Sequence, residues 1–579
     1  MASFQVWAPV ADGVDLCLRG ERLPMAAGAG GWWRLQAEAG DGDRYAYSLD
    51  GSEPLPDPRS ASQPDGVASP SALVEHAGFH WHDDSWPGLD LQRAILYELH
   101  VGTFTRQGTF DAAAKRMPHL RELGIDAVEV MPVAEFPGER GWGYDGVDLF
   151  APHHSYGGPD GLKRFVSSCH DAGIAVLLDV VYNHLGPDGN YLPRFGPYFS
   201  GEHETHWGSA VNLDGPGSHE VRRFLLDNAL MWLRDYHIDG LRLDAVHAMV
   251  DNSAVHFLEE LASEVGTLGA RLGKSLVLIG ESDLNDPRFV RPRHEDGYGL
   301  DACWADEWHH ALHAALTGER SGYYEDFGSL EQLSKALLQA WVYDGIWSEH
   351  RQRVHGHRPD GLPGSAFVVS LQNHDQIGNR AQGERLGALV SRQRLAAAAA
   401  LLMTSPFVPM LFQGEEWGAT TPFQYFTDHS DPTLGRAVTT GRRHEFAAFG
   451  WEPDSVPDPQ ALSTYEDSRL DWSELDGGDH KSLLDWYKTL VGIRKRYSCL
   501  TDGRWDLAEA SVDPDSRLLR WRRGDIVLWV NLGCSPVSEA VPDGGRLLAA
   551  YGDGSETDGA AVSIPPDGVV ICALARRPS

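Results

Sequence analysis

The pattern of hydrophobic and polar positions divides the chain into three zones. In the first zone, short stretches alternate apolar or aromatic residues with polar ones, and Gly, Asp and Pro turns separate them: Phe4–Ala8, Val14–Leu18, Trp32–Ala37 and Arg44–Leu49. A period of two residues is typical of strands that bury one face. We therefore expect residues 1–88 to form a small N-terminal β-sandwich.

From about residue 93 the pattern changes to continuous apolar runs, which are candidate buried strands: Ala94–Leu99, Ala127–Val133, Ile174–Val181, Gly240–Val246, Leu276–Gly280, a weaker run at Asp301–Ala305, Ala366–Leu371 and Phe407–Phe412. Helical spacing occurs between them, over Phe110–Leu123 and Val221–Tyr236. Apolar strands that alternate with helices indicate a parallel sheet covered on both faces. Eight such units within residues 89–500 favour an α/β fold with a closed (β/α)8 TIM barrel. We expect the long stretches 182–217 and 306–365 to be loops over its active-site face.

In the third zone, residues 501–579, the period of two returns. It is clearest in Leu518–Trp521 and Ile526–Val530. We therefore expect a C-terminal antiparallel β domain.

Composition narrows the classes of partner. A chain of 579 residues is too long for one core. A formal net charge of −34 disfavours nucleic acid and anionic membranes, which both need a cationic face. The N-terminus lacks a signal-peptide pattern, no run approaches eighteen apolar residues, and the six cysteines form no CxxC pair. We expect a cytoplasmic protein without a membrane span.

Ionisable residues end four of the apolar runs, in the segments Asp179–His184, Gly240–Asp244, Gly280–Asp283 and Gln372–Asp375. Because the carboxyl ends of barrel strands meet on one rim, we expect these side chains to converge. Buried charges of this density are costly unless they pair or act in catalysis. Ordinary loop-end charges with structural hydrogen bonds explain any one of them, but not the whole ordered set.

The set suits the cleavage of a glycosidic bond. A retaining mechanism needs one carboxylate that attacks the anomeric carbon and a second carboxylic acid that protonates the leaving oxygen. Arg242 stands two positions before Asp244 on the same face of a strand, where it can keep that carboxylate ionised.

The four segments together resemble the four conserved regions of the α-amylase superfamily (glycoside hydrolase family 13). The resemblance implies that Asp244 is the nucleophile, Glu281 the general acid/base and Asp375 the stabiliser of the transition state. It also assigns residues to the subsite that holds the attacked glucose: Tyr144, Asp145, His184, Arg242 and His374. It implies no cofactor.

Asn183 matches a calcium ligand of some α-amylases, but the acidic cluster that completes that site is not recognisable, so we expect no metal ion. The resemblance also makes the N-terminal sandwich Ig-like and similar to carbohydrate-binding modules. Whether this sandwich binds glucan or only supports the barrel stays open.

Finer features separate members of the superfamily. The segment Tyr97–Phe104 resembles both branching enzymes and maltooligosyltrehalose trehalohydrolases. Further stretches look like the trehalohydrolases alone: Glu281–Asp286, Gln372–Asn379, Pro422–His429 and Gly441–Phe446. This resemblance implies cleavage of the α-1,4 bond next to the terminal trehalose of maltooligosyltrehalose, and a maltooligosyltrehalose synthase as functional partner.

Alternatives remain. A branching enzyme or a general α-1,4-glucan hydrolase would share the three carboxylates. A catalytically dead amylase-like scaffold would lose some of them. Asp283 is a weak candidate for binding the trehalose end, and Glu416 is another. Gly280 departs from the family, in which an alanine commonly precedes the acid.

Overall fold

The predicted barrel is present in the computed structural model, which describes all residues except 448–450, 453–454, 543, 553, 555, 558–560 and 575–579. Eight parallel strands close on themselves in chain order: β8 (Leu96–Leu99), β9 (Ala127–Val130), β12 (Ala175–Val180), β15 (Gly240–Leu243), β16 (Val277–Gly280), β17 (Ala302–Trp304), β20 (Phe367–Ser370) and β21 (Val408–Phe412). The weak run near Asp301 is therefore a true strand, β17.

Helices surround the barrel, and most of them bury one apolar face toward it. The main ones are α3 (Met117–Leu123), α4 (Gly158–Asp171), α6 (Ser218–Asp235), α7 (Phe257–Leu272), α8 (Asp306–Thr317), α9 (Leu330–Gln339), α12 (Arg392–Thr404) and α15 (Gly478–Arg496). α12 is instead buried on all sides, with α15 packed against it. The helix expected over Val221–Tyr236 is α6. The one expected over Phe110–Leu123 is broken into α2 (Phe110–Ala114) and α3, because Pro118 is tolerated only in a first turn.

The stretch 306–365 is not the loop that we expected. It holds α8 and α9, followed by a hairpin of β18 (Asp344–Ser348) and β19 (Arg353–Gly356). Glu307, His309 and His313 of α8 are buried together with its apolar residues, so the polarity of the sequence does not mark its buried face. The stretch 182–217 does project as a hairpin, formed by β13 (Phe199–Thr205) and β14 (Gly208–Val211).

Two small antiparallel sheets precede the barrel. One has the order β1 (Ala2–Trp7), β5 (Trp32–Ala37), β4 (Ala26–Ala27), and the other β3 (Glu21–Pro24), β2 (Val14–Leu18), β6 (Arg44–Leu49), β7 (Ser71–Ala72). Their inner faces share a core in which the Phe4 and Tyr45 rings lie 5.1 Å apart. Arg59 ties this unit to the barrel through an ion pair of 2.8 Å with Asp227 on α6.

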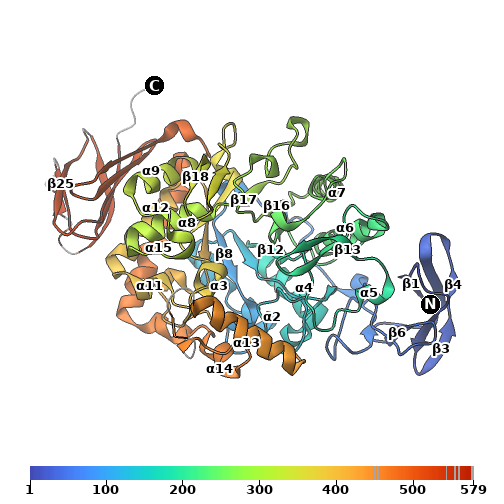
Figure 1. The fold of residues 1–579 in the computed structure, drawn as a ribbon. Helices are drawn as coiled ribbons and strands as arrows, with labels where there is room; N and C mark the ends of the chain where they lie inside the picture. Colours follow the sequence, from blue (N-terminus) through green and yellow to red (C-terminus); the bar gives the residue numbers. More distant parts are fainter. Residues whose placement is uncertain are drawn as a thin grey trace.

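Two further antiparallel sheets follow the barrel. The larger has the order β22 (Ala508–Asp513), β23 (Leu518–Arg523), β24 (Ile526–Asn531), β29 (Val569–Ala573), β26 (Arg546–Tyr551); the smaller has β25 (Val537–Ala540), β28 (Ala561–Ile564), β27 (Glu556–Thr557). Figure 1 shows these sheets and the N-terminal sheets at opposite ends of the molecule, with the barrel between them.

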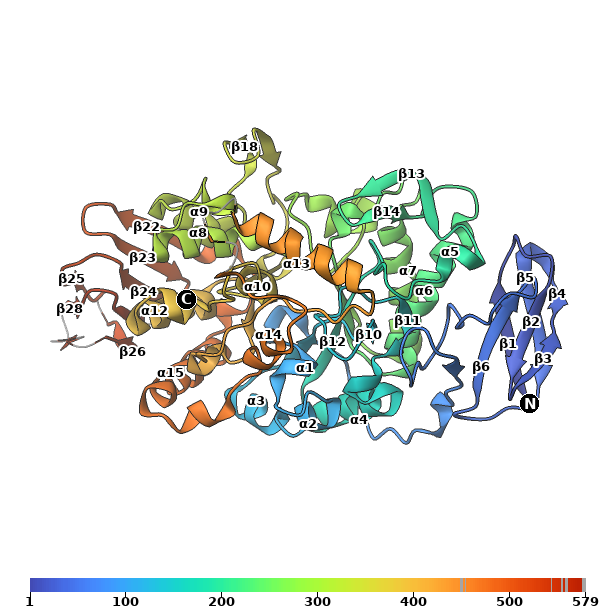
Figure 2. The ribbon, with the colours of Figure 1, turned by 60° about the horizontal axis from the view of Figure 1, so that its bottom comes forward.

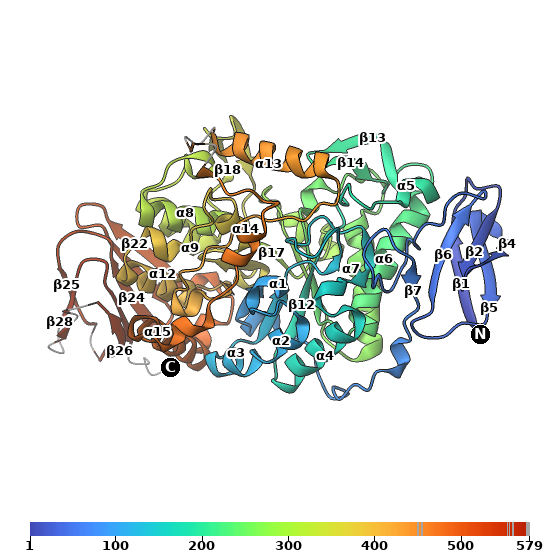
Figure 3. The ribbon, with the colours of Figure 1, turned by 90° about the horizontal axis from the view of Figure 1, so that it is seen from below.

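Segments from three parts of the chain lie on one side of the barrel. Figure 3 shows β13, β18 and the long helix α13 (Pro432–Ala447) along the same edge, and in Figure 2 α13 crosses in front of the barrel, below β13 and β18. Among the described residues, no helix has the length and apolar character to cross a membrane.

Candidate active site

Asp244 and Arg242 face each other at the end of β15. Residues two positions apart in a strand lie on the same face, so the Arg242 guanidinium reaches its own strand's carboxylate, with Nη1 3.0 Å from Asp244 Oδ1. Asn183, after β12, donates from Nδ2 to the second oxygen, Oδ2, at 2.8 Å. Both oxygens of the buried Asp244 carboxylate are therefore held by hydrogen bonds.

Glu281 follows β16 and meets the same guanidinium. Arg242 Nη2 lies 2.8 Å from Glu281 Oε2, so one planar cation bridges Asp244 and Glu281. The backbone N–H of Ala245 also donates to Oε2, at 2.8 Å. Ala245 has φ 38°, a left-handed conformation that costs a non-glycine residue about 1–2 kcal/mol. This turn aims its N–H at Glu281 immediately after Asp244.

A chain of hydrogen bonds runs beneath these two acids. Arg242 Nη1 donates to Asp179 Oδ2 at 2.6 Å, and the Tyr144 hydroxyl donates to the same oxygen at 2.6 Å. Tyr144 Oη also lies 2.9 Å from His374 Nε2, and the two rings stack 5.2 Å apart. On its far side His374 Nδ1 lies 2.6 Å from Oε1 of Glu98, at the end of β8.

The loop backbone holds Tyr144 in this position. Gly143 precedes it with φ 100°, and a Cβ there would lie 2.1 Å from the Pro132 carbonyl oxygen. Only glycine fits such a site. The neighbouring Trp142 stacks on Phe423 at 5.2 Å, which fixes the rest of the loop against the segment after β21.

Asp375 is presented by the short helix α10 (His374–Gly378), directly after β20. Asn373 caps this helix by accepting from the N–H groups of Asp375 and Gln376. Asn379 Nδ2 donates to Asp375 Oδ1 at 2.6 Å. Burial raises the pKa of Asp375, although the nearby His374 cation opposes the shift.

Carboxyl groups outnumber cations in this cluster. Around Arg242 and His374 lie Glu98, Glu129, Asp179, Asp244, Glu281, Asp306 and Asp375. Burial raises the pKa of Asp179 to about 6, and burial, with Glu281 and Asp375 nearby, raises that of Asp306 to about 8. Burial lowers the pKa of His374, but Glu98 outweighs it and brings the value to about 9. Asp306 is therefore mostly a neutral acid at pH 7, and His374 a cation.

The other sequence-predicted residues lie around the cluster. His184 is buried, its Nδ1 is hydrogen-bonded to Asn183, and its ring stacks on the half-exposed Trp207 at 5.0 Å. Asp145 reaches the neighbourhood of His429, with 3.9 Å between Oδ2 and Nε2. Asp283 is not joined to Asp244 or Glu281 by any contact of the described residues; it instead pairs with Arg351 at 2.8 Å.

Sequence reasoning missed several members of the site. Asp179 lies at the end of an apolar run and Glu98 lies within the segment Tyr97–Phe104, but neither position alone indicates a role in the site. Asp306 follows the weak apolar run that forms β17, and no motif marks it. In such a barrel, the first acid after each strand is expected to face the rim. Applied to every strand, this rule predicts Asp306 as a member of the site. Glu416, one of the two weak candidates for the trehalose end, is instead buried behind β8, where its Oε2 accepts a 3.2 Å hydrogen bond from Tyr97.

A cavity of about 110 Å³ opens beside Asp375. Its walls include Tyr323, Asn379 and the bidentate ion pair of Arg380 with Glu319, at 2.9 and 3.0 Å. Asn379 connects it to the cluster, because the same residue donates to Asp375. The rim thus offers both an acid cluster and an adjoining polar recess.

Comparisons with known proteins agree with this geometry. Residues 60–197 match the family model described as the catalytic domain of alpha amylase. The chain is 50% identical over 556 residues to the malto-oligosyltrehalose trehalohydrolase of Arthrobacter ramosus, which covers 95% of this chain and 96% of the relative. It is 49% identical to the protein of the same name from Rhizobium sp. (strain M-11), over 97% of this chain and 96% of the relative.

Among solved structures, a Salmonella typhimurium protein described as a candidate alpha amylase superposes with a TM-score of 0.91 at 37% identity. The match covers 99% of this chain and 97% of that one. Near-full-length identity of this size, together with the barrel and its acid cluster, shows that the chain belongs to the malto-oligosyltrehalose trehalohydrolase family within the α-amylase superfamily.

Proposed function

We propose that this protein is a retaining glycosidase that hydrolyses the α-1,4 bond next to the terminal trehalose of maltooligosyltrehalose, releasing trehalose and a maltooligosaccharide. The observation that carries the proposal is the single guanidinium of Arg242 that bridges Asp244 and Glu281. The carboxyl groups of Asp244 and Glu281, which follow adjacent strands, both contact this one guanidinium and therefore lie close together. A nucleophile and its partner acid need such proximity.

In the first step, an Asp244 carboxylate oxygen bonds to the anomeric carbon while the glycosidic bond breaks. Glu281 gives its proton to the departing oxygen, so the leaving trehalose is neutral. Both contacts of Glu281 use Oε2, which leaves Oε1 for this transfer. Arg242 and Asn183 keep the nucleophile oriented.

In the second step, Glu281 takes a proton from water as the water oxygen attacks the same carbon. The bond to Asp244 breaks, and the α configuration is restored. Asp375 holds sugar hydroxyls and offsets the positive charge that develops on the ring. Tyr144 supports that ring by stacking, and His374 and His184 contact its hydroxyls.

The leaving-group side must distinguish trehalose from maltose. Trehalose is α,α-1,1-linked, so its second glucose presents hydroxyls in other directions than maltose does. Two polar sites near the acid cluster are the candidates for this recognition: the Asp283–Arg351 pair and the recess lined by Arg380 and Glu319. Polar groups placed for the wrong hydroxyls stay unpaired, and each such loss costs about 1–3 kcal/mol.

The substrate ends in a trehalose unit that hydrolases of plain glucan do not make. A maltooligosyltrehalose synthase is therefore the expected supplier, and the cytoplasm the expected compartment. Nucleic acid and membranes are not expected partners of a chain with net charge −34.

Digestion of maltotriosyl trehalose with identification of the products tests the proposal. We expect equal amounts of trehalose and maltotriose, with the fresh maltotriose in the α form by early-time NMR. Longer branched glucan would instead identify a branching enzyme. Maltose among the first products would indicate a general glucan hydrolase, no turnover a dead scaffold, and a β product an inverting mechanism.

A further inference from the structure

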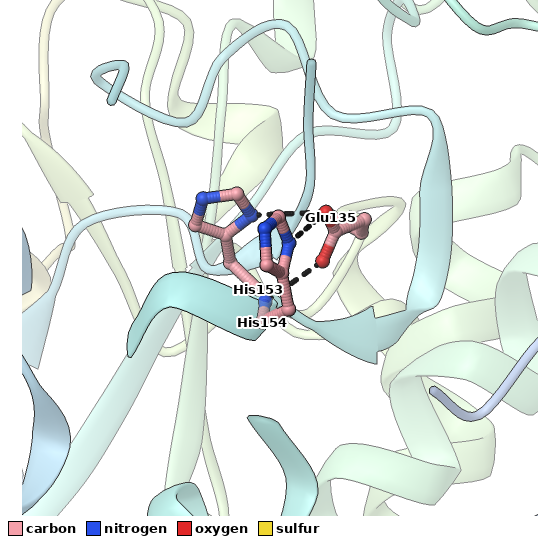
Figure 4. Close-up of side chains that lie close together, drawn as sticks. All are labelled: Glu135, His153 and His154. Atoms are coloured by element: carbon pink, nitrogen blue, oxygen red, sulfur yellow. Dashed lines mark hydrogen bonds and ion pairs between the residues drawn. The ribbon is translucent and has the colours of Figure 1, made fainter. Parts of the chain in front are cut away.

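Away from the acid cluster, a glutamate and two consecutive histidines converge at the base of the loop that carries Tyr144 (Figure 4). Glu135 lies in β10 (Ala134–Glu135), and His153 and His154 follow β11 (Asp148–Pro152), which pairs with β10. We propose that these three side chains form a binding site for a divalent transition-metal ion of the zinc type. The proposal goes beyond the glycosidase function.

The separations between the candidate ligand atoms suit a small ion. His153 Nδ1 lies 3.2 Å from Glu135 Oε1, and His154 Nδ1 lies 2.6 Å from the same oxygen. Ligand atoms about 2.0–2.2 Å from a tetrahedral zinc are roughly 3.3 Å apart. The first pair already has this separation. The second is a hydrogen bond that opens by roughly 0.7 Å when the metal replaces its proton.

His153 supplies an independent observation. Its side chain is fully buried, yet neither ring nitrogen makes a hydrogen bond to any described residue. Phe136 stacks on its ring at 3.7 Å, so one face of the imidazole is apolar. Buried polar atoms are normally paired. Nδ1 lies 3.2 Å from Glu135 Oε1 without hydrogen-bond geometry, and a metal ion bound by both atoms would pair each of them.

The surroundings prepare His154 as a ligand. Its Nε2 lies 3.3 Å from Oε1 of Glu139, so the Nε2 proton keeps a carboxylate acceptor when a metal ion replaces the proton on Nδ1. Glu135 Oε2 accepts the His154 backbone N–H at 2.9 Å, which fixes the carboxylate. The His154 side chain is 20% exposed, so an ion can enter and water can complete its coordination.

Two imidazoles and one carboxylate select zinc, cobalt or nickel over calcium and magnesium, which prefer oxygen ligands alone. This site is also separate from the amylase calcium pattern around Asn183, whose amide is bonded to Asp244 and His184. The ion would join the two ends of the segment 136–152, which consists of the loop 136–147 and β11. We therefore expect it to stabilise the platform that holds Trp142 and Tyr144.

Titration of chelator-treated protein with ZnCl2 in a calorimeter, and with CoCl2 by visible absorption, tests the site. We expect one equivalent of zinc with a Kd below about 10 µM. We also expect the intense absorption of four-coordinate Co²⁺ and a rise in Tm with zinc but not with MgCl2 or CaCl2. His154→Gln and Glu135→Gln should each weaken zinc binding at least about tenfold, because each removes one ligand.

His294→Gln is the matched control, since His294 is 80% exposed and sits 3.7 Å from Glu295 without a second histidine. It should bind zinc like the unaltered protein. Equal weakening by His294→Gln and His154→Gln, or the weak absorption of six-coordinate Co²⁺, would overturn the site. The cobalt spectrum of the unaltered protein decides if a variant fails to fold. None of these readouts uses glycosidase activity, so failure here leaves the proposed function standing.

Discussion

At the end of the barrel where the strands begin, Asp83, His170 and Asp239 form a chain of ion pairs, whereas at the other end carboxyl groups crowd around Arg242 and His374. At the first end each carboxylate has a cationic partner. His170 Nδ1 lies 2.8 Å from Asp83 and Nε2 lies 2.9 Å from Asp239. Partial burial disfavours the charged form of Asp83, but hydrogen bonds from His170 and His237, with Lys274 3.5 Å away, hold its pKa below the usual range.

Trp86 closes this first network. It stacks on His170 at 4.7 Å, and its indole donates to Asp239 at 2.7 Å. At the opposite end the pKa values of Asp179, Asp306 and Glu129 are raised, because burial disfavours charges that the two cations cannot all offset. The same residue types are thus paired where their charges balance, and have raised pKa values, as is common in active sites, where they do not.

Asp244→Asn should have the largest effect at the acid-rich end. An amide cannot form the glycosyl ester, so kcat/KM on maltotriosyl trehalose should fall at least about 10⁴-fold. The Tm should not fall, because one of several crowded acids is neutralised. Steady-state kinetics and thermal unfolding measure both. Activity within tenfold of the unaltered enzyme would remove Asp244 from its role.

Glu281→Gln should have the next largest effect. Loss of proton donation should lower kcat on glucan substrates by about 10²–10⁴-fold, but much less on a glycosyl fluoride, whose leaving group needs no proton. The alkaline limb of the pH–rate profile should move or vanish. Equal losses on both substrates would show that Glu281 only binds.

Asp239→Asn tests the balanced end. Removal of one partner from a buried ion pair should lower the free energy of unfolding by about 3–5 kcal/mol, with kcat/KM within about twofold of normal. Asp239 and Asp83 raise the pKa of His170 against the effect of burial. The network therefore stabilises the fold fully when the pH is below the pKa of His170 in the unfolded chain. This stabilisation disappears as the pH rises through the pKa of His170 in the folded protein. Destabilisation should therefore be greater at pH 6 than at pH 9; the reverse order would contradict the network.

Asp306→Asn should have the smallest effect of the four substitutions, and it should stabilise the protein, whereas Asp239→Asn destabilises it. A carboxyl whose pKa is raised by folding opposes the folded state increasingly as the pH rises from about 4 to about 8. Asparagine removes this penalty, so the Tm of the variant relative to the unaltered protein should rise by about 2–4 °C between those values and then level off. A lower Tm at pH 8.5 would show that Asp306 is ionised and paired.

The barrel and most of the residues on its rim could be predicted from the sequence. Buried parallel strands are continuous apolar runs, and the residues that follow these runs lie at one edge of the barrel. The sequence placed Asp244, Glu281 and Asp375 on strands whose ends the structure brings together. Their catalytic roles stay predictions. So do the domain boundaries at 88 and 500.

Other features depend on contacts that no local pattern contains. Glu98 contacts His374, which is 276 positions away in the chain. The raised pKa of Asp306 depends on its burial and on acids that follow other strands. Glu135 and His154 are separated by a loop whose ends are brought together by the pairing of β10 with β11. The first two juxtapositions arise from the closed barrel and the third from a two-stranded sheet outside it, not from spacing along the chain.

The ratio of kcat/KM on maltotriosyl trehalose to that on maltopentaose tests the central claim most directly. Both substrates have five glucose units, so they differ only in the linkage at the leaving end. If two or three polar groups of the cleft are placed for trehalose hydroxyls, the ratio should be at least about 100. A ratio near one would contradict trehalose recognition, even if both bonds are cleaved with retention.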